Sequence, residues 1–237
     1  MKKIAIMQPY FFPYLGYISL LKHTDEFILF DTVQFIRHGW IERNRILKQG
    51  EGWLYIKAPI VKEARDTLIK DVLINNKEDW KAKIRAQLQP YKKIAPYYRD
   101  VISMIEELFE NDYDTIVELN KASLEAICDY LGINHDIKVF SKMDLSIEPA
   151  NAPDEWALNI CKALGDIDEY WNPPGGQEFF DRKKYDDAGI KLVFHKSLLS
   201  AYDQKREPFE PGLSILDVLM FNSPEKVNKM LDVYELL

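Results

Sequence analysis

The residues best suited to move a proton in this sequence are His38 and Asp31. An imidazole can accept and release a proton near neutral pH, and His38 stands beside basic residues and a Gly-Trp pair. Asp31 directly follows the apolar run Phe27–Phe30, and an α/β fold places functional side chains at the carboxyl end of such a strand. We therefore predict His38 and Asp31 as catalytic acid–base residues. The alternatives are an ordinary loop histidine and an aspartate that caps the next turn.

Two arginines separated by one residue, Arg43 and Arg45, could capture an anionic group. A guanidinium forms paired hydrogen bonds to a phosphate or a carboxylate. In an extended segment alternate side chains share a face, which would put Arg43 and Arg45 on one face and Asn44 on the other. We predict that Arg43, Asn44 and Arg45 bind a pyrophosphate or carboxylate of the substrate. Salt bridges to surface carboxylates are the alternative.

The loop after the first apolar run is rigid and aromatic. Pro9 and Pro13 prevent regular strand pairing there, and a helical spacing begins soon afterwards. Gln8 offers a fixed amide, while Tyr10 and Tyr14 offer rings on which a base or sugar could stack. The start of the following helix would also favour an anion such as phosphate. We predict a ligand site in this loop, with aromatic core packing as the alternative.

A second loop signal is the Asn-Pro-Pro-Gly-Gly segment at residues 172–176. Paired glycines can expose successive backbone N–H groups to an anion, although ligand-free turns use the same residues. We expect Gln8, Arg45 and the Gly175-Gly176 pair to line one cleft, because each lies at a strand end or in a loop. The predicted substrate-binding residues are Gln8, Tyr10, Tyr14, Gln34, Arg43, Asn44, Arg45, Asn172, Gly175 and Gly176.

Other motifs point away from several enzyme classes. Ser214 and Asp217 have the spacing of a near-capping box at a helix start, which explains both without catalysis. The chain has no Gly-x-Ser-x-Gly elbow, no phosphate-binding P-loop and no His/Cys/carboxylate set with metal spacing. Cys128 and Cys161 lie in separate apolar segments and are expected to be buried thiols. We predict no metal, and the cofactor is unknown.

The composition is that of a folded globular protein. Hydrophobic residues make up 47% of 237 residues, enough to bury a substantial core. The net charge of −7 disfavours nucleic acid and anionic membranes as partners. No apolar run is long enough to cross a bilayer. We therefore expect a soluble, cytoplasmic protein that binds no nucleic acid and does not insert into membranes.

The pattern of apolar residues predicts an α/β fold. Short apolar runs predict strands at Ile4–Met7, Phe27–Phe30, Trp53–Ile56, Val72–Ile74, Ile137–Phe140 and Leu192–Phe194. Helical spacing predicts helices at Lys77–Leu88, Val101–Phe109, Thr115–Leu131, Pro153–Leu164, Ser214–Phe221 and Pro224–Leu236. We expect a mostly parallel, Rossmann-like sheet flanked by helices in a single domain, residues 1–237, with residues 77–131 as a helical insertion or subdomain.

Four blocks of this sequence resemble the WbqC-like family, and together they cover nearly the whole chain. The blocks are Gln8-Pro9-x-x-x-Pro13-x-x-Gly16-Tyr17 with Asp31-x-x-Gln34-Phe35, then Trp40–Ile46 with Trp53-Leu54, then Asn172–Phe180, and finally Phe209–Asn222. Bacterial members of this family are known mainly from gene clusters for O-antigen and other surface polysaccharides. The resemblance therefore implies a small-molecule substrate from that chemistry.

Three functional hypotheses follow from the residues and the resemblance. The first is a transferase acting on a nucleotide- or carrier-linked amino sugar, with an acyl or aminoacyl donor. The second is a non-catalytic sugar-nucleotide-binding or assembly protein. The third is a nucleotidyltransferase-like enzyme that lacks the usual histidine motif, since Pro13–Gly16 reads Pro-Tyr-Leu-Gly. An enzyme is favoured if His38 or Asp31 opens onto the same cleft as Gln8 and Arg45, and a binding protein if both face solvent elsewhere.

Overall fold

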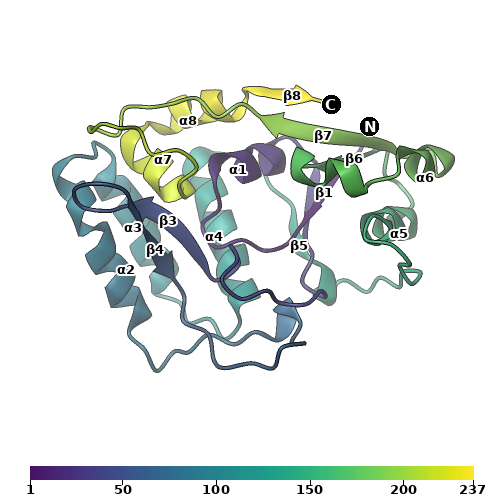
Figure 1. Ribbon diagram of the computed structural model, residues 1–237, viewed down its shortest axis with the longest axis horizontal. Coiled ribbons are helices and arrows are strands. Elements are labelled where there is room, and N and C mark those ends of the chain that lie inside the picture. The colour runs from purple at the N-terminus through teal and green to yellow at the C-terminus, as the bar shows by residue number, and fades with distance from the viewer.

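The computed structural model describes residues 1–237 and is built around a six-stranded sheet with the strand order β5–β2–β1–β6–β7–β8 (Figure 1). The strands are β1 Lys3–Met7, β2 Glu26–Leu29, β5 Ile137–Val139, β6 Glu169–Asn172, β7 Lys191–Ser197 and β8 Tyr234–Leu236. All neighbouring strands are parallel except β7 and β8. A separate antiparallel hairpin pairs β3 (Arg43–Leu47) with β4 (Trp53–Lys57). The predicted mostly parallel α/β fold is confirmed.

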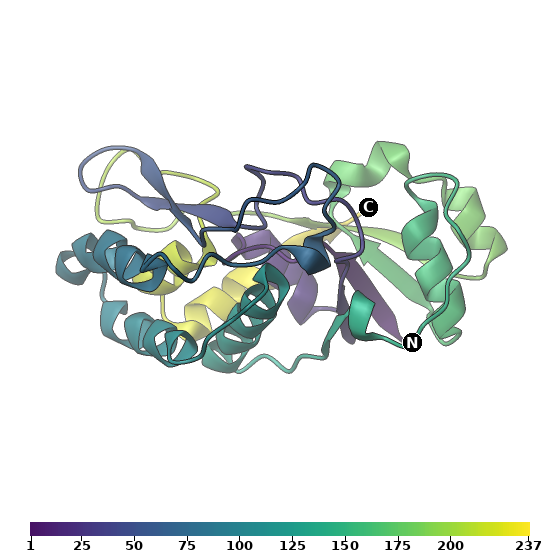
Figure 2. The same cartoon turned by 90° about the horizontal axis from the view of Figure 1, so that it is seen from below.

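Helices cover both faces of the sheet because the strands alternate their apolar side chains. In β1, Ala5 faces a core of 52 buried residues, whereas Ile4 and Ile6 face a second core of 15. The larger core takes side chains from α1–α4, α7 and α8, and the smaller one from α5 and α6, which lie at the opposite end of the molecule from α2 and α3 (Figure 2). The helices are α1 Leu15–Lys22, α2 Trp80–Leu88, α3 Tyr98–Phe109, α4 Ile116–Leu131, α5 Glu155–Leu164, α6 Arg182–Asp187, α7 Ile215–Phe221 and α8 Pro224–Leu231.

None of the helices has the length and apolar character needed to cross a bilayer. Short 3₁₀ helices complete the fold. The 3₁₀ helices are η1 Ile69–Asp71, η2 Gln89–Lys93, η3 Phe140–Lys142 and η4 Pro174–Phe179. Residues 77–131, which we interpret as a helical insertion, contain α2, η2, α3 and α4. Their buried side chains belong to the same 52-residue core as those of α1 and β2.

Two predicted elements are wrong. Val72–Ile74 does not form a strand, because these residues follow η1 and make only isolated bridges to Ile60 and Thr115. The last helix ends at Leu231, and Tyr234–Leu236 instead form β8. This short segment pairs with β7, which would otherwise be an open sheet edge, and the pairing overrides the helical spacing.

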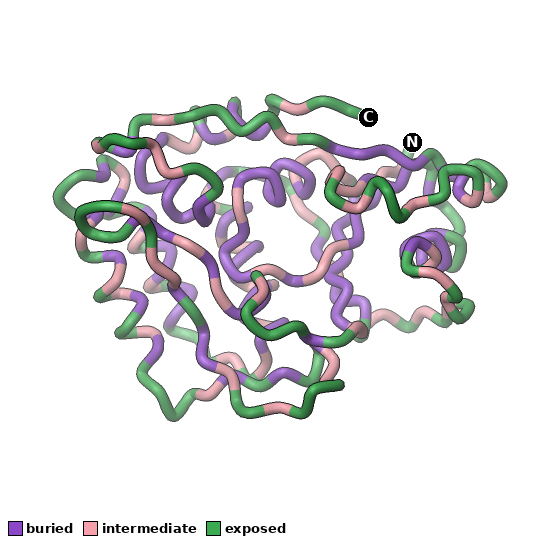
Figure 3. Tube along the Cα trace, in the orientation of Figure 1, coloured by how far each residue is buried: buried purple, intermediate pink, exposed green.

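The strand order creates a crevice between β1 and β6. From β1 the chain proceeds to β2 and β5 on one side of the sheet, whereas from β6 it proceeds to β7 on the other side. The connections that leave the carboxyl ends of β1 and β6 therefore diverge. Such a switch point is where open α/β sheets bind their ligands. Figure 3 shows that β1, β7 and α1 are largely buried, whereas the β3–β4 turn is exposed.

Candidate functional site

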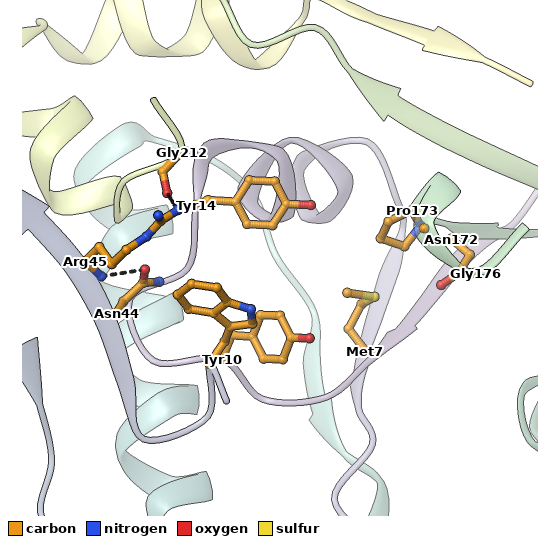
Figure 4. A pocket seen from close by; sticks show the side chains of 11 residues that line it. Met7, Tyr10, Tyr14, Asn44, Arg45, Asn172, Pro173, Gly176 and Gly212 are labelled. Carbon is orange, nitrogen blue, oxygen red and sulfur yellow. Dashed lines mark hydrogen bonds between the residues drawn. The ribbon is translucent and has the colours of Figure 1, made fainter. Parts of the chain in front are cut away.

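A cleft of about 480 Å³ lies at the carboxyl ends of β1 and β6 (Figure 4). Met7 ends β1 and Asn172 ends β6, so both strands deliver a residue to it. The remaining walls come from the loop after β1, from the segment around β3, from η4 and from the loop before α7. The residues lining the cleft are Met7, Tyr10, Tyr14, Trp40, Asn44, Arg45, Asn172, Pro173, Gly175, Gly176 and Gly212.

The loop after β1 is held in place by three side chains that are distant in sequence. The buried amide of Asn44 donates to the carbonyl oxygen of Phe12 at 2.9 Å, and the hydroxyl of Ser214 donates to the same oxygen at 2.7 Å. The buried amide of Asn120 donates to the carbonyl oxygen of Pro9 at 2.9 Å. Phe12 has a φ of 40°, which is unusual for a bulky residue, and these bonds stabilise that conformation. The loop is therefore fixed before any ligand arrives.

The aromatic residues of this loop divide between the core and the cleft. Phe11, Phe12 and Tyr17 are fully buried, so the core-packing alternative accounts for them. Tyr10 and Tyr14 are half-buried and line the cleft, where Tyr10 points toward Met7 and Tyr14 toward Pro173 (Figure 4). Burial raises the pKa of both hydroxyls, which therefore stay protonated at neutral pH. The cleft thus presents two uncharged phenols.

Gly16 allows Tyr14 to take this position. A Cβ atom added at Gly16 would lie 2.5 Å from a ring carbon of Tyr14 and 3.2 Å from the Cβ atom of Ser197. Real contacts are never as short as the first of these distances, so the ring would have to move. The first helical turn after the loop therefore needs a glycine to position the tyrosine at the cleft.

Arg45 is the cationic residue of the cleft. Its guanidinium carbon lies 5.4 Å from the ring centre of Trp40 and 5.2 Å from that of Trp53, so two indoles flank the charge. Nη2 donates to the carbonyl oxygen of Gly212 at 2.9 Å, whereas Nε is buried without a hydrogen-bond partner. This bond holds the guanidinium in one orientation, and Nη1, which makes no hydrogen bond within the protein, remains able to donate to an anion.

Arg43 belongs to a different hollow. The burial pattern of β3 places Arg43 and Arg45 on one face and buried Asn44 on the other, as the alternation predicts. However, Arg43 donates to the carbonyl oxygen of His38, and its guanidinium carbon lies 4.1 Å from the ring centre of Tyr55. Arg43 and His38 border a hollow of about 370 Å³ that shares no residue with the cleft. The two arginines therefore do not converge on one group.

Neither predicted acid–base residue lines the cleft. His38 is exposed, and its backbone N–H donates to Glu42 at 2.7 Å. Asp31 is buried, and its two carboxylate oxygens accept from the N–H and the hydroxyl of Ser141, at 2.9 and 2.5 Å. Asp31 thus ties the end of β2 to η3, which contains Ser141. Only His38 faces solvent, so the structure meets neither of the two expected arrangements in full.

The two predicted glutamines also lie outside the cleft lining. Gln8 follows Met7 in the sequence and is half-buried. Its carbonyl oxygen accepts from the Tyr17 hydroxyl at 2.9 Å, and its side-chain amide makes no hydrogen bond within the protein. Gln34 is exposed, and its amide donates to the carbonyl oxygen of Arg65 at 2.6 Å. Of the expected trio, Arg45 and the Gly175-Gly176 pair share the cleft, whereas Gln8 is not among its lining residues.

Several residues of the site escaped prediction. Met7, Trp40, Pro173 and Gly212 line the cleft, and Asn120 supports its loop. The Gly-Trp pair beside His38 is the signal that could have revealed Trp40. No local pattern marks Asn120, because a polar residue within a helix is normally solvent-exposed.

Asp217 is not a capping residue, and this prediction is wrong. Ser214 does cap α7, since its hydroxyl accepts from the N–H of Leu216 at 3.2 Å. The carboxylate of Asp217 instead accepts from the hydroxyls of Tyr91, at 2.5 Å, and Tyr202, and from the amide of Gln204 at 3.1 Å. Burial raises the pKa of Asp217 to about 6, although these three hydrogen bonds oppose the shift. Asp217 thereby fastens the loop before α7 to η2.

Comparison with known proteins identifies the family. A model described as the WbqC-like protein family matches residues 8–229, which include every block of the resemblance. The chain belongs to this family. It is 32% identical over 225 residues to the uncharacterized protein Rv1507c of Mycobacterium tuberculosis, covering 94% of each chain. No solved structure matches.

Proposed function

We propose that this WbqC-like protein binds a nucleotide- or carrier-linked sugar of bacterial surface-polysaccharide assembly in the cleft between β1 and β6. The observation that carries this proposal is the position of the cleft at the switch point of a parallel sheet, the usual ligand site of such folds. The polysaccharide context is taken from the resemblance to members found in O-antigen gene clusters.

The chemistry of the lining supports this class of ligand. Tyr10, Tyr14 and Trp40 provide faces on which a sugar or a base can stack. Arg45 provides a positive charge that suits the phosphate linking the sugar to its nucleotide or carrier. A volume of about 480 Å³ falls within the range of small-molecule sites.

Binding is better supported than catalysis. The cleft lining contains no carboxylate, imidazole or thiol. Its titratable groups are Arg45 and the phenols of Tyr10 and Tyr14, and none of these is a base at neutral pH. An acyl or aminoacyl transfer in this cleft would therefore need a base from a residue outside the lining or from the second substrate.

Mass spectrometry of the native protein tests the proposal, because a tightly held ligand survives purification. We expect a mass corresponding to a phosphorylated sugar. Calorimetry with UDP-N-acetylglucosamine, UDP and free N-acetylglucosamine then separates the parts of the ligand. Tighter binding of the intact compound than of either part supports the proposal, whereas no binding of any phosphorylated sugar in either experiment contradicts it.

A further inference from the structure

A second hollow, of about 570 Å³, lies at the end of the molecule away from β6, and all its charged residues are basic. No aspartate or glutamate lines it, in a chain whose net charge is −7. None of its residues lines the cleft described above. Its cationic residues are Lys48, Lys92, Lys93, Lys205 and Arg206.

Two loops that are far apart in the sequence form the rim of this hollow. They are the β3–β4 turn and the loop at residues 198–213, which lie side by side in Figures 1 and 2. The guanidinium of Arg206 joins them by donating to the carbonyl oxygens of Lys48 at 3.0 Å, Gly50 at 2.8 Å and Gly52 at 2.7 Å. Its Nε is buried without a partner. The rim is therefore fixed by its own hydrogen bonds.

The floor of the hollow is fixed as well. Tyr91 is 1% exposed, and its hydroxyl accepts from the N–H of Leu47 at 2.8 Å and donates to Asp217 at 2.5 Å. These bonds tie η2 to β3 and to α7. Lys92 and Lys93, which follow Tyr91 directly, are thus held at the edge of the hollow by a buried anchor.

Three of the lysines have no carboxylate partner. Lys205 forms an ion pair with Asp203 at 2.5 Å, but Lys48, Lys92 and Lys93 are exposed and form no salt bridge. Like charges gathered around one hollow repel one another, and a bound anion would relieve that repulsion. Ammonium groups act as point charges and suit phosphate oxygens approached from several directions.

We propose that this basic hollow, lined by Lys48, Lys92, Lys93, Lys205 and Arg206, is a second ligand site that binds a chain of adjacent phosphates. A single-stranded nucleic acid fits less well, because such sites stack bases on exposed rings and the aromatic residue here, Tyr91, is buried. The proposal does not depend on the function proposed for the cleft.

Calorimetry with inorganic tripolyphosphate tests this site. We expect binding that weakens as salt is added, and a loss of about tenfold or more in a Lys48→Gln/Lys92→Gln/Lys93→Gln variant. The matched control, Lys162→Gln/Lys226→Gln/Lys229→Gln, removes three exposed lysines that form no salt bridge, and it should bind within about twofold of the unmodified protein. Equal weakening in both variants, or no binding to the unmodified protein, would overturn the proposal.

Two further measurements locate the site and its source of phosphate. An Arg45→Ala variant should keep its affinity for tripolyphosphate, and a loss there would move the site to the cleft and overturn the proposal. Flotation with vesicles containing 20% phosphatidic acid tests a membrane surface as the source. Binding to these vesicles without binding to tripolyphosphate would contradict a site for soluble phosphate chains.

Discussion

At the residue scale, Arg45 should contribute most of the affinity for the anionic part of a ligand in the cleft. Replacing it by alanine removes a charged donor that two indoles hold in place. We expect Arg45→Ala to weaken binding of a phosphorylated sugar by about 1.5–3 kcal/mol, the scale of a hydrogen bond to a charged group. Isothermal titration calorimetry measures this directly.

The control for this variant is Arg99→Ala. Arg99 is exposed on α3 and forms no hydrogen bond or salt bridge through its side chain. Its removal changes the net charge by the same amount and should leave the affinity unchanged. If both variants weaken binding equally, the effect is one of overall charge and Arg45 is not a ligand contact.

Gly175 offers a way to fill the cleft without disturbing the fold. A Cβ atom added there meets nothing within 4 Å, and its φ is not positive, so a side chain can be accommodated. We expect Gly175→Trp to abolish ligand binding while the free energy of unfolding changes by less than about 0.5 kcal/mol. Gln177→Trp, at an exposed position of the same 3₁₀ helix outside the cleft, should bind normally. Normal binding by Gly175→Trp would mean that the ligand lies elsewhere.

Residue types and their place at strand ends predicted part of this cleft. Tyr10 and Asn172 come together because parallel strands send their following loops to one edge of the sheet, whereas Arg45 reaches the cleft from the separate β3–β4 hairpin. The same reasoning misplaced Asp31, since its partner Ser141 lies 110 residues away and no local pattern announces that contact. Such long-range pairing decides whether a buried carboxylate serves a ligand or the fold.

At the element scale, the loop after β1 depends on one residue of α4. Asn120 is fully buried and links the carbonyl oxygens of Pro9 and Ile41, each at 2.9 Å. Asn120→Ala leaves both oxygens without this donor, so we expect a loss of about 1–3 kcal/mol in the free energy of unfolding. Urea titration followed by circular dichroism measures it. The exposed Asn151→Ala should change stability little, and an equal loss in both variants would contradict a special role for Asn120.

Elements with strong local signals were the predictable ones. Helix α4 begins at a capping box between Thr115 and Glu118 and ends at Gly132, whose φ of 65° suits a left-handed cap. By contrast, β8 is defined by pairing with β7 rather than by its own residues. Its sequence, Tyr234–Leu236, continues a helical spacing, so the sequence alone favoured the wrong element.

At the scale of the whole molecule, stability should respond to the ionisation of Asp217. Its pKa is raised from 3.8 to about 6 in the folded protein. The protonated carboxyl therefore stabilises the folded state below about pH 4, and this stabilisation is lost as the pH rises through about 6. The loss is about 3 kcal/mol. The amide in Asp217→Asn does not ionise, so this variant does not undergo the loss. We therefore expect its free energy of unfolding, relative to that of the unmodified protein, to rise by about this amount between pH 4 and pH 7.5, measured by urea unfolding.

Two other groups give this measurement its controls. The pKa of Asp203, in the loop before α7, is lowered from 3.8 by its bonds to Lys205, so its contribution to stability is lost only below about pH 4 and Asp203→Asn should show almost no trend between pH 4 and pH 7.5. Burial lowers the pKa of His195 to about 4, and its protonation therefore opposes folding in acid. Because His195 and Asp217 act in opposite directions, the unmodified protein alone should show a shallow dependence on pH. A flat difference between Asp217→Asn and the unmodified protein would contradict the assignment.

The loop at residues 198–213 contributes Gly212 to the cleft and Lys205 and Arg206 to the basic hollow. Because both sites share this loop, any shift of the loop by a ligand at one site would change the affinity of the other site. The two binding equilibria are then linked, and thermodynamic linkage is reciprocal. The factor by which tripolyphosphate changes the affinity of the cleft must therefore equal the factor by which the ligand of the cleft changes the affinity for tripolyphosphate.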